Sequence, residues 1–258
     1  MERVRKPCQG VWNIIRFNWH YYVLSVLFVA GLSLARRYTI APYSDIAQTA
    51  SIVVSLSILV SLLVSTYIYD YSALYRLTWL NQFEIGKDDV LVNIHAGFDE
   101  TSILLKHKYI SESNEDNLKV FDFYDPEKHT EVSIKRARRT YPCYRGTVAI
   151  ETSHVPLPSD SADVVFNILA AHEIRQEEER IIFFNELNRI LKPDGKIIVT
   201  EHLRDLPNFL AYNIGFFHFH SKATWLRTFH AADLTVDTVI KITPFITTFI
   251  LVKHGTAS

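Results

Sequence analysis

Ionisable side chains recur directly after the short apolar runs in the later part of this sequence. Five such runs stand at residues 90–95, 119–123, 147–151, 163–169 and 196–200. The ionisable residues at or just after their ends are His95 and Asp99, Asp122 and Asp125, Glu151, His172 and Glu173, and Glu201 and His202. If the runs are parallel strands of one sheet, their carboxyl ends meet at the edge where open α/β sheets bind ligands. The sequence therefore predicts a site rich in histidines and carboxylates at that edge.

Histidine is the side chain best suited to act as a general base at neutral pH, because its ordinary pKa is about 6.5. His172 is the first candidate, since it follows the fourth apolar run. His202, His218 and His220 are the next candidates. For each of them the alternative is a histidine that hydrogen-bonds a loop carbonyl and has no catalytic role.

The pair His218 and His220, with Glu201 and His202 upstream, raises the question of a metal site. Two histidines two residues apart can bind one ion on a strand, but they point apart on a helix. The two cysteines of the chain are too few for a cysteine-based zinc site, and no accompanying ligand motif is recognisable. We therefore predict no metal.

The apolar runs alternate with segments of helical periodicity, which predicts a doubly wound α/β domain with a mostly parallel sheet. Helices are expected at residues 100–108, 127–141, 176–191 and 222–232. Residues 192–195 (KPDG) end the third helix with turn chemistry. Two last runs, 234–242 and 245–252, are close enough around Thr243-Pro244 to pair as an antiparallel hairpin.

The first 70 residues have a different pattern, because residues 17–35 and 46–69 contain no charged side chain. As helices these runs would measure roughly 28 and 36 Å, against a hydrocarbon core of about 30 Å. The ten residues between them include Pro42 and Asp45 and predict a tight turn. We therefore expect a transmembrane helical hairpin. The alternative is a pair of buried core helices.

Basic residues indicate how this hairpin would be oriented. More of them precede the first run than lie in the turn, which favours a cytoplasmic position for both termini. The expected location is the membrane, multi-pass, with the later domain in the cytoplasm. The basic residues are Arg3, Arg5, Lys6 and Arg16 before the first run, and Arg36 and Arg37 in the turn.

The overall composition narrows the function classes. The 258 residues have a formal net charge of −1, which gives no basic footprint for nucleic acid. A hydrophobic content of 48% excludes a disordered chain. We expect a membrane anchor at residues 1–70 and a folded domain at residues 71–258, with a small-molecule or lipid partner and no nucleic acid.

Three segments of the second part carry a family resemblance. Residues 155–165 read VPLPSDSADVV, residues 170–173 read AAHE, and residues 185–196 read NELNRILKPDGK. They resemble the LPLPDGSFDVV, ALHH and EIxRVLKPGGR segments of class I S-adenosylmethionine-dependent methyltransferases of type 11. The similarity runs from about Leu80 to the C-terminus. It implies a Rossmann-like fold whose terminal hairpin supplies a reversed strand, and S-adenosylmethionine as the cofactor.

The resemblance also implies which residues would bind that cofactor. The family's first strand ends in an acidic loop, D-x-G-x-G-x-G, whereas residues 93–99 (NIHAGFD) keep only Gly97. His95 and Asp99 must therefore contact the cofactor or obstruct it, and Asp99 is also a plausible N-cap for the next helix. Asp122 matches the acid that binds the ribose hydroxyls, with Asp125 as its substitute. By the same resemblance, the acidic position near the adenine falls at Glu151.

Taken together, these features predict a membrane-anchored S-adenosylmethionine-dependent methyltransferase with an apolar or amphiphilic acceptor, such as a lipid or a quinone-like compound. The aromatic-rich stretch 206–219 lies where relatives place an acceptor-binding lid. The alternative is a catalytically degenerate methyltransferase fold that serves as a binding or assembly module at the membrane. The altered glycine loop is the main support for that alternative.

Overall fold

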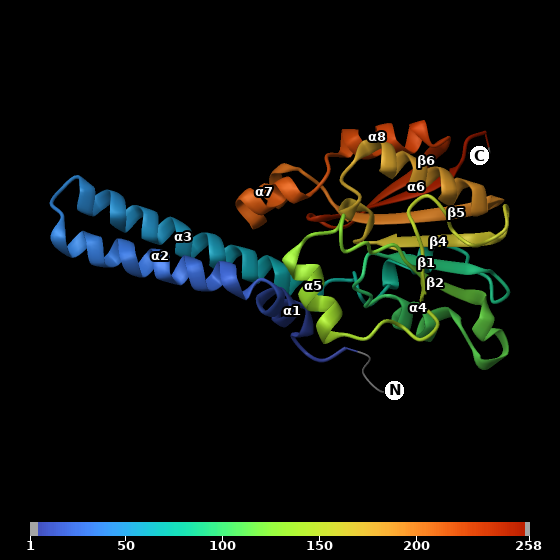
Figure 1. The fold of residues 1–258 in the computed structure, drawn as a ribbon, viewed down its shortest axis with the longest axis horizontal. Coiled ribbons are helices and arrows are strands. Elements are labelled where there is room, and N and C mark those ends of the chain that lie inside the picture. The colour runs from blue at the N-terminus through green and yellow to red at the C-terminus, as the bar shows by residue number, and fades with distance from the viewer. Residues whose placement is uncertain (1–4, 256–258) are drawn as a thin grey trace.

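The structure, a computed structural model, describes residues 5–255, so Arg3 of the basic residues counted above lies outside the described part. An α/β domain carries a helical hairpin that projects from one end (Figure 1). The hairpin consists of α2 (Trp19–Tyr38) and α3 (Tyr43–Thr66), and a short helix, α1 (Gln9–Phe17), precedes it.

Seven strands form one mixed sheet in the order β3-β2-β1-β4-β5-β7-β6. The first five strands are parallel, and β7 is antiparallel to both β5 and β6. The strand order reverses between β1 and β4, and this is the switch point where ligands bind in such sheets. The predicted doubly wound sheet with a reversed terminal pair is confirmed. The strands are β1 (Leu91–His95), β2 (Leu118–Asp122), β3 (Val148–Ala149), β4 (Ala162–Ile168), β5 (Leu191–His202), β6 (Leu234–Thr243) and β7 (Ile246–Lys253).

Both faces of the central strands are buried, as near-continuous apolar strands require, whereas the edge strands β3 and β6 are partly exposed. On one face, α6 (Glu177–Ile190) and α8 (Lys222–Ala231) pack their aromatic residues against the strands, with Phe184 and Trp225 fully buried. On the other face, α4 (Ser102–Tyr109) packs together with the chain that follows the hairpin. The buried residues of that following chain are Ile68, Leu74, Leu77, Trp79 and Leu80.

The chain therefore enters the domain before residue 71. The end of α3 continues into a π-helical turn, η1 (Tyr67–Tyr71), and then into a 3-10 turn, η2 (Thr78–Gln82). Asp70 of η1 accepts the backbone N–H groups of Gly10 and Val11 at 2.7 and 2.9 Å, which satisfies free donors of the first turn of α1. A Cβ at Gly10 would lie 2.3 Å from the Cβ of Tyr69, so only glycine permits this approach.

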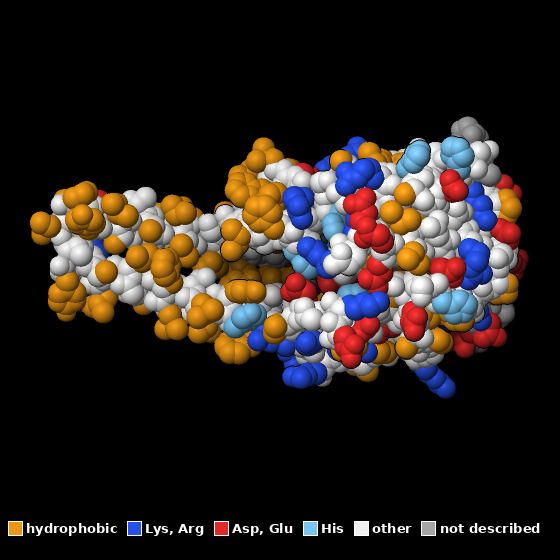
Figure 2. Space-filling view, turned by 45° about the horizontal axis from the view of Figure 1, so that its top comes forward, with side chains coloured by type: hydrophobic (Ala, Val, Ile, Leu, Met, Phe, Trp, Pro, Cys, Tyr) orange, Lys and Arg blue, Asp and Glu red, His pale blue; other side chains and the backbone are white. Residues whose placement is uncertain are grey.

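The helical hairpin leaves its apolar side chains exposed, and Figure 2 shows them along its length. All side chains of α2 are at least partly exposed. One helix of the described residues, Tyr43–Tyr71, is long and apolar enough to cross a membrane. The first predicted span reaches that criterion only when α1 and α2, which meet at an angle of 71°, are counted as one. The break falls at Asn18, between α1 and α2.

Several predicted boundaries differ from the structure. The segment 192–195 is a bulge inside β5 rather than a turn, since Ala162 pairs with Leu191 and Val164 with Lys196. The helix expected at 127–141 is shorter, α5 (Val132–Thr140). The stretch 206–219 forms α7 (Leu206–Tyr212) and η5 (Asn213–His218). Short 3-10 turns also occur at η3 (Glu112–Asn117) and η4 (Ala171–Glu173).

Candidate functional site

A cavity of about 220 Å³ lies at the switch point of the sheet. Its walls come from α1, from α5, from the loop after β1 and from the ends of β4 and β5. His172 and His202 line it, together with Glu100, Tyr69 and Phe219. A larger hollow of about 970 Å³ is lined by α4, β2 and residues 144–148, and the predicted site residues lie elsewhere. The smaller cavity is therefore the candidate site.

Asp122 ends β2 and is buried beside the loop that follows β1. Its Oδ1 accepts the backbone N–H of Gly97 at 2.8 Å and that of Tyr124 at 2.9 Å. Its Oδ2 accepts a hydrogen bond from Nη1 of Arg138, which lies on α5. Asp122, the carboxylate expected to bind ribose, thus lies beside the loop after β1 with its Oδ2 paired to Arg138, and the ribose assignment stays a prediction.

His95 and Asp99 border the same loop and leave polar atoms without partners. The ring nitrogens of His95 lie 3.7 Å from Asp122 Oδ1 and 3.8 Å from Asp99 Oδ2, beyond hydrogen-bond distance. Both nitrogens and Asp99 Oδ2 are buried without a hydrogen-bond partner among the described residues. Because unpaired buried polar atoms are costly, this cluster fits a polar ligand group.

Asp99 is not the N-cap residue of α4, which is Thr101, but it contributes to the start of that helix. Its Oδ1 accepts the backbone N–H groups of Thr101 and Ser102, each at 2.9 Å. Gly97 beside it has a φ of +83°, and a Cβ there would lie 2.9 Å from the Arg138 side chain. The one glycine retained from the family loop is thus required by both backbone conformation and space.

The side chains of Asp125 and Glu151, the other two acids expected to bind the cofactor, make local hydrogen bonds. Asp125 Oδ1 accepts the backbone N–H of Glu127 at 2.9 Å, so this carboxylate caps its own turn. Glu151 is exposed, and its Oε2 accepts from Ser153 Oγ at 3.3 Å. Both cofactor assignments stay predictions.

His172 lies on η4, directly after β4, with both ring nitrogens facing carboxylates. Nδ1 is 2.7 Å from Oε2 of the fully buried Glu201, and Nε2 is 3.3 Å from Oε1 of Glu173. Burial alone would lower the pKa of His172, but Glu201 and Glu173 outweigh it and raise that pKa to about 10. The role of His172 as a base stays a prediction, and it would require Glu173 or Glu201 to move.

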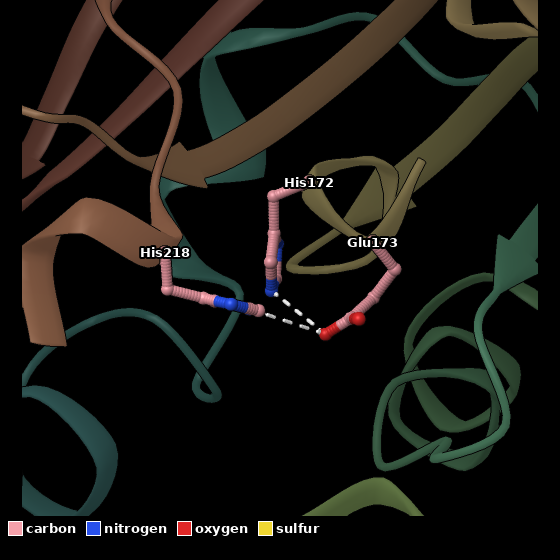
Figure 3. Close-up of side chains that lie close together, drawn as sticks. All are labelled: His172, Glu173 and His218. Atoms are coloured by element: carbon pink, nitrogen blue, oxygen red, sulfur yellow. Dashed lines mark ion pairs between the residues drawn. The ribbon is translucent and has the colours of Figure 1, made fainter. Parts of the chain in front are cut away.

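His218 ends η5 and reaches the same place from another segment (Figure 3). Its Nε2 lies 3.4 Å from Glu173 Oε1, and its ring stands nearly perpendicular to that of His172 at 5.1 Å between centroids. Burial favours a higher pKa for Glu173, but its hydrogen bonds to His172 and His218 outweigh it and hold the pKa well below its ordinary range. The structure therefore brings two of the four predicted histidines together.

His202 ends β5 and is buried in a neutral setting. Its Nδ1 is 2.9 Å from Asn208 Oδ1, so Nδ1 carries the proton, and its Nε2 accepts from the hydroxyl of Tyr69 at 2.8 Å. Burial lowers the pKa of His202 to about 4, although Asn208 opposes this. The ring stacks on Phe219 at 4.7 Å. His202 is thus a neutral histidine whose hydrogen-bond partner reaches the cavity from the end of α3.

His220 lies apart from this cluster, against the buried Arg180. Its Nε2 is 3.3 Å from Arg180 Nη1, and its ring contacts Trp225. Burial, followed by the positive charge of Arg180, lowers the pKa of His220 to about 3. The two histidines that are two residues apart in the sequence therefore face different partners.

Sequence reasoning missed several residues of the site, because they come from segments assigned to the anchor or to plain helices. Glu100 lines the cavity and pairs with Arg5 at 3.1 Å and with Gln9 at 3.0 Å. Burial raises the pKa of Glu100, although Arg5 opposes this. Tyr69 and Arg138 were missed for the same reason. One signal was the basic residue Arg5, which precedes α1 and pairs with Glu100.

Comparisons with known proteins found similarity to one family model and to solved structures. Residues 127–199 match the family model described as a methyltransferase domain. The PH0226 protein from Pyrococcus horikoshii OT3 has a TM-score of 0.50 at 13% identity, over 70% of this chain and 88% of that chain. A SAM-dependent methyltransferase from Aquifex aeolicus has a TM-score of 0.48 at 17% identity, over 70% and 93%. A search of curated proteins found no match.

The matched segment 127–199 includes α6 and the strands on either side of it, where the sequence resemblance is strongest. The likeness to the Pyrococcus structure concerns the fold. The domain match supports the expected enzyme class, an S-adenosylmethionine-dependent methyltransferase, and with it the expected cofactor.

Proposed function

We propose that this chain is a membrane-attached methyltransferase whose acceptor is an apolar or amphiphilic small molecule, such as a lipid or a quinone-like compound. One observation carries the proposal: the same cavity is lined by the base of the hairpin and by the strand ends. Phe17 and Tyr69 contribute from the hairpin side, and His172 and His202 from the sheet. An acceptor held in the bilayer would thus meet the site where the hairpin joins the domain.

The surface around this junction supports an apolar acceptor. On α7, Leu206, Phe209 and Leu210 are exposed. A small apolar hollow lies between α7 and α3, with Val60 and Val64 on its α3 side. Hydrophobic side chains therefore extend from the hairpin onto the domain (Figure 2). Patches of this kind are typical of membrane or protein contact, and attachment raises the local concentration of a membrane-bound acceptor.

We further propose that both helices of the hairpin cross the bilayer, with both termini and the domain in the cytoplasm. A hairpin returns the chain to the side from which it entered, so α1 and the domain share one side (Figure 1). Arg5, Lys6 and Arg16 lie on that side, whereas Arg36 and Arg37 lie near the tip. This is the distribution that the positive-inside rule associates with a cytoplasmic domain.

The cofactor, when bound, supplies a methyl group on a positively charged sulfur. Two features of this chain suit a bound cofactor. They are the buried unpartnered atoms of His95 and Asp99, and the absence of a side chain at Gly97 in the loop after β1. Asp122 would hold the ribose hydroxyls once Arg138 leaves its Oδ2. The aromatic walls, Phe98 and Phe219 among them, would exclude water and hold the acceptor in line.

One pair of variants tests which histidine acts as the base. If His172 accepts a proton from the acceptor, His172→Ala should lower turnover by about 10²–10⁴-fold with cofactor affinity nearly intact. A purely structural His172 would instead lower the melting temperature and preserve turnover per folded molecule. His202→Ala is the matched comparison, because His202 is the neutral histidine of the same cavity.

The proposal is tested by methyl transfer from labelled S-adenosylmethionine to material extracted into organic solvent, with the full chain in lipid vesicles. Label in the organic phase supports it, and label confined to water-soluble products contradicts it. The alternative is a binding module without activity. It is favoured by the hydrogen bond from Arg138 to Asp122, which blocks one oxygen of the carboxylate proposed to bind ribose. Calorimetric titration with S-adenosylmethionine separates the two, since an affinity no better than about 1 mM would favour the module.

A further inference from the structure

Three ligand-type side chains converge beside the cavity, from two segments of the chain. His172 and Glu173 lie on η4 after β4, and His218 ends η5. One ligand atom from each lies within 4.8 Å of the others, and Figure 3 shows the three side chains pointing toward one another. Their side-chain exposures of 12%, 8% and 27% leave the cluster reachable from solvent. Two imidazoles and one carboxylate form the ligand set of many catalytic zinc and iron sites.

Each histidine of the cluster is also held from behind by a second carboxylate. Nδ1 of His172 is 2.7 Å from Glu201 Oε2, and Nδ1 of His218 is 3.5 Å from Glu131 Oε1. Nε2 of each ring then faces the same oxygen, Oε1 of Glu173. A carboxylate behind the ring nitrogen that does not bind the ion is the usual outer arrangement of metal-binding histidines, because it orients the ring.

Nε2 of each ring and Oε1 of Glu173 are ligand atoms that face one another. When Nδ1–H of His172 donates to Glu201, the Nε2 lone pair points toward a carboxylate oxygen, which is itself an acceptor. Nε2 of His218 faces the same oxygen at 3.4 Å, and Glu131 Oε1 lies 3.5 Å from its Nδ1. A positively charged ion in the space that these three atoms face would be coordinated by all of them.

The spacing of the atoms fits an ion. Two ligands at about 2.0–2.1 Å from a tetrahedral ion lie about 3.3–3.4 Å apart. The distances from Glu173 Oε1 are 3.3 Å to His172 Nε2 and 3.4 Å to His218 Nε2. These two separations match an ion of that size, and all three ligand atoms lie within 4.8 Å of one another.

We propose that His172, Glu173 and His218 bind one divalent transition-metal ion, of which Zn²⁺ is the probe. Three protein ligands leave at least one position for water or for an oxygen of a bound molecule. Because His172 also lines the cavity, that position would lie at the cavity wall. The proposal replaces the expectation of no metal, which was based on the pair His218 and His220, and it does not depend on methyl transfer. Because Nδ1 of His172 is engaged by Glu201, a His172 whose Nε2 binds the ion cannot also act as the base, so the two roles exclude each other.

The test is metal binding by the full chain in detergent micelles after removal of metals with a chelator. Calorimetric titration with Zn²⁺ should show one saturable site with a dissociation constant in the micromolar range or below. Co²⁺ should give visible absorption bands that Zn²⁺ abolishes. Glu173→Gln and His218→Ala should each weaken binding by at least about 100-fold, and Glu131→Gln by about 10-fold, as an outer carboxylate does.

The matched control is His154→Ala, since His154 is an exposed histidine outside the cluster, 4.0 Å from Glu186. The affinity of the His154→Ala variant for Zn²⁺ should equal that of the unmodified chain. Absence of saturable binding up to about 1 mM Zn²⁺ would overturn the proposal, and so would equal binding by Glu173→Gln and the control. His172→Ala is not required, so a folding defect in that variant does not affect the test.

Discussion

Asp122 carries the most specific prediction at the scale of single residues. Asp122→Ala should weaken S-adenosylmethionine binding by about 1.5–3 kcal/mol, the usual cost of losing hydrogen bonds to a charged group. Asp125→Ala is the control, because that carboxylate caps its own turn and should leave affinity unchanged. Calorimetry on both variants checks this. A larger loss in Asp125→Ala would move the ribose contact to Asp125.

His202 should make the stability of the protein depend on pH. Its pKa is about 4 in the folded protein and about 6.5 in an unfolded chain, so the unfolded chain binds the proton more readily. The free energy of unfolding should therefore fall by up to about 3 kcal/mol as the pH drops from about 6.5 to about 4.

His202→Gln isolates this effect, because glutamine can donate to Asn208 and accept from Tyr69 without titrating. Urea unfolding at pH 7 and pH 4.5 should show a smaller loss of stability in the variant than in the unmodified chain. Equal losses in the two proteins would mean that His202 is not the group responsible.

The sequence was informative about which residues gather at the strand ends, but not about what they contact there. Residues at the ends of parallel strands must share an edge, so His172, His202 and Asp122 could be placed together from the pattern alone. Their partners, such as Arg138 and Tyr69, come from distant helical segments. Helical periodicity shows that such residues lie on a helix, and it does not show which strand end they reach.

At the scale of elements, we predict that α5 controls access to Asp122, the carboxylate proposed to bind ribose. Arg138 on α5 is 32% exposed and pairs with Asp122, so a diol that binds Asp122 would have to displace it. Arg138→Ala should tighten S-adenosylmethionine binding by up to about 5-fold, the gain expected from removing a partly exposed ion pair that competes. Arg136→Ala on the same helix is the control. Weaker binding in Arg138→Ala would show that the arginine contacts the cofactor instead.

The elements differ in how well the sequence could define them. Buried strands and amphipathic helices such as α6 follow from periodicity, and their predicted ranges agree with the structure within a few residues. The segment 192–195 has turn residues but is a bulge in β5, because pairing with β4 resumes at Lys196. A local turn preference cannot reveal pairing that neighbouring strands impose.

At the scale of the whole molecule, the hairpin can be separated from the domain only at the right residues. Deletion of residues 1–70, the predicted anchor, would remove the buried Ile68 and the Tyr69 that contacts His202. Loss of a buried isoleucine alone costs about 2–5 kcal/mol. We therefore expect that truncation to be unstable, contrary to the boundary at residue 71 that the hydropathy pattern favours.

Replacement of residues 23–62 by a flexible glycine–serine linker should have a different result. The domain keeps α1 and η1, so its melting temperature and its affinity for S-adenosylmethionine should be preserved, while the protein no longer sediments with vesicles. A linker variant that cannot fold would show that the hairpin is part of the core. One that still sediments would show that another surface, such as α7, suffices for attachment.

The position of the cavity at the base of the hairpin has a kinetic consequence for the function proposed here. Because Phe17 and Tyr69 line the cavity from the hairpin side, an acceptor dissolved in the bilayer would arrive by lateral diffusion. The quantity that sets the encounter rate is then the mole fraction of acceptor in the lipid. The concentration of acceptor per volume of suspension has no direct effect. Dilution of the acceptor with inert lipid would slow such an enzyme even when the amount of acceptor per litre stays the same.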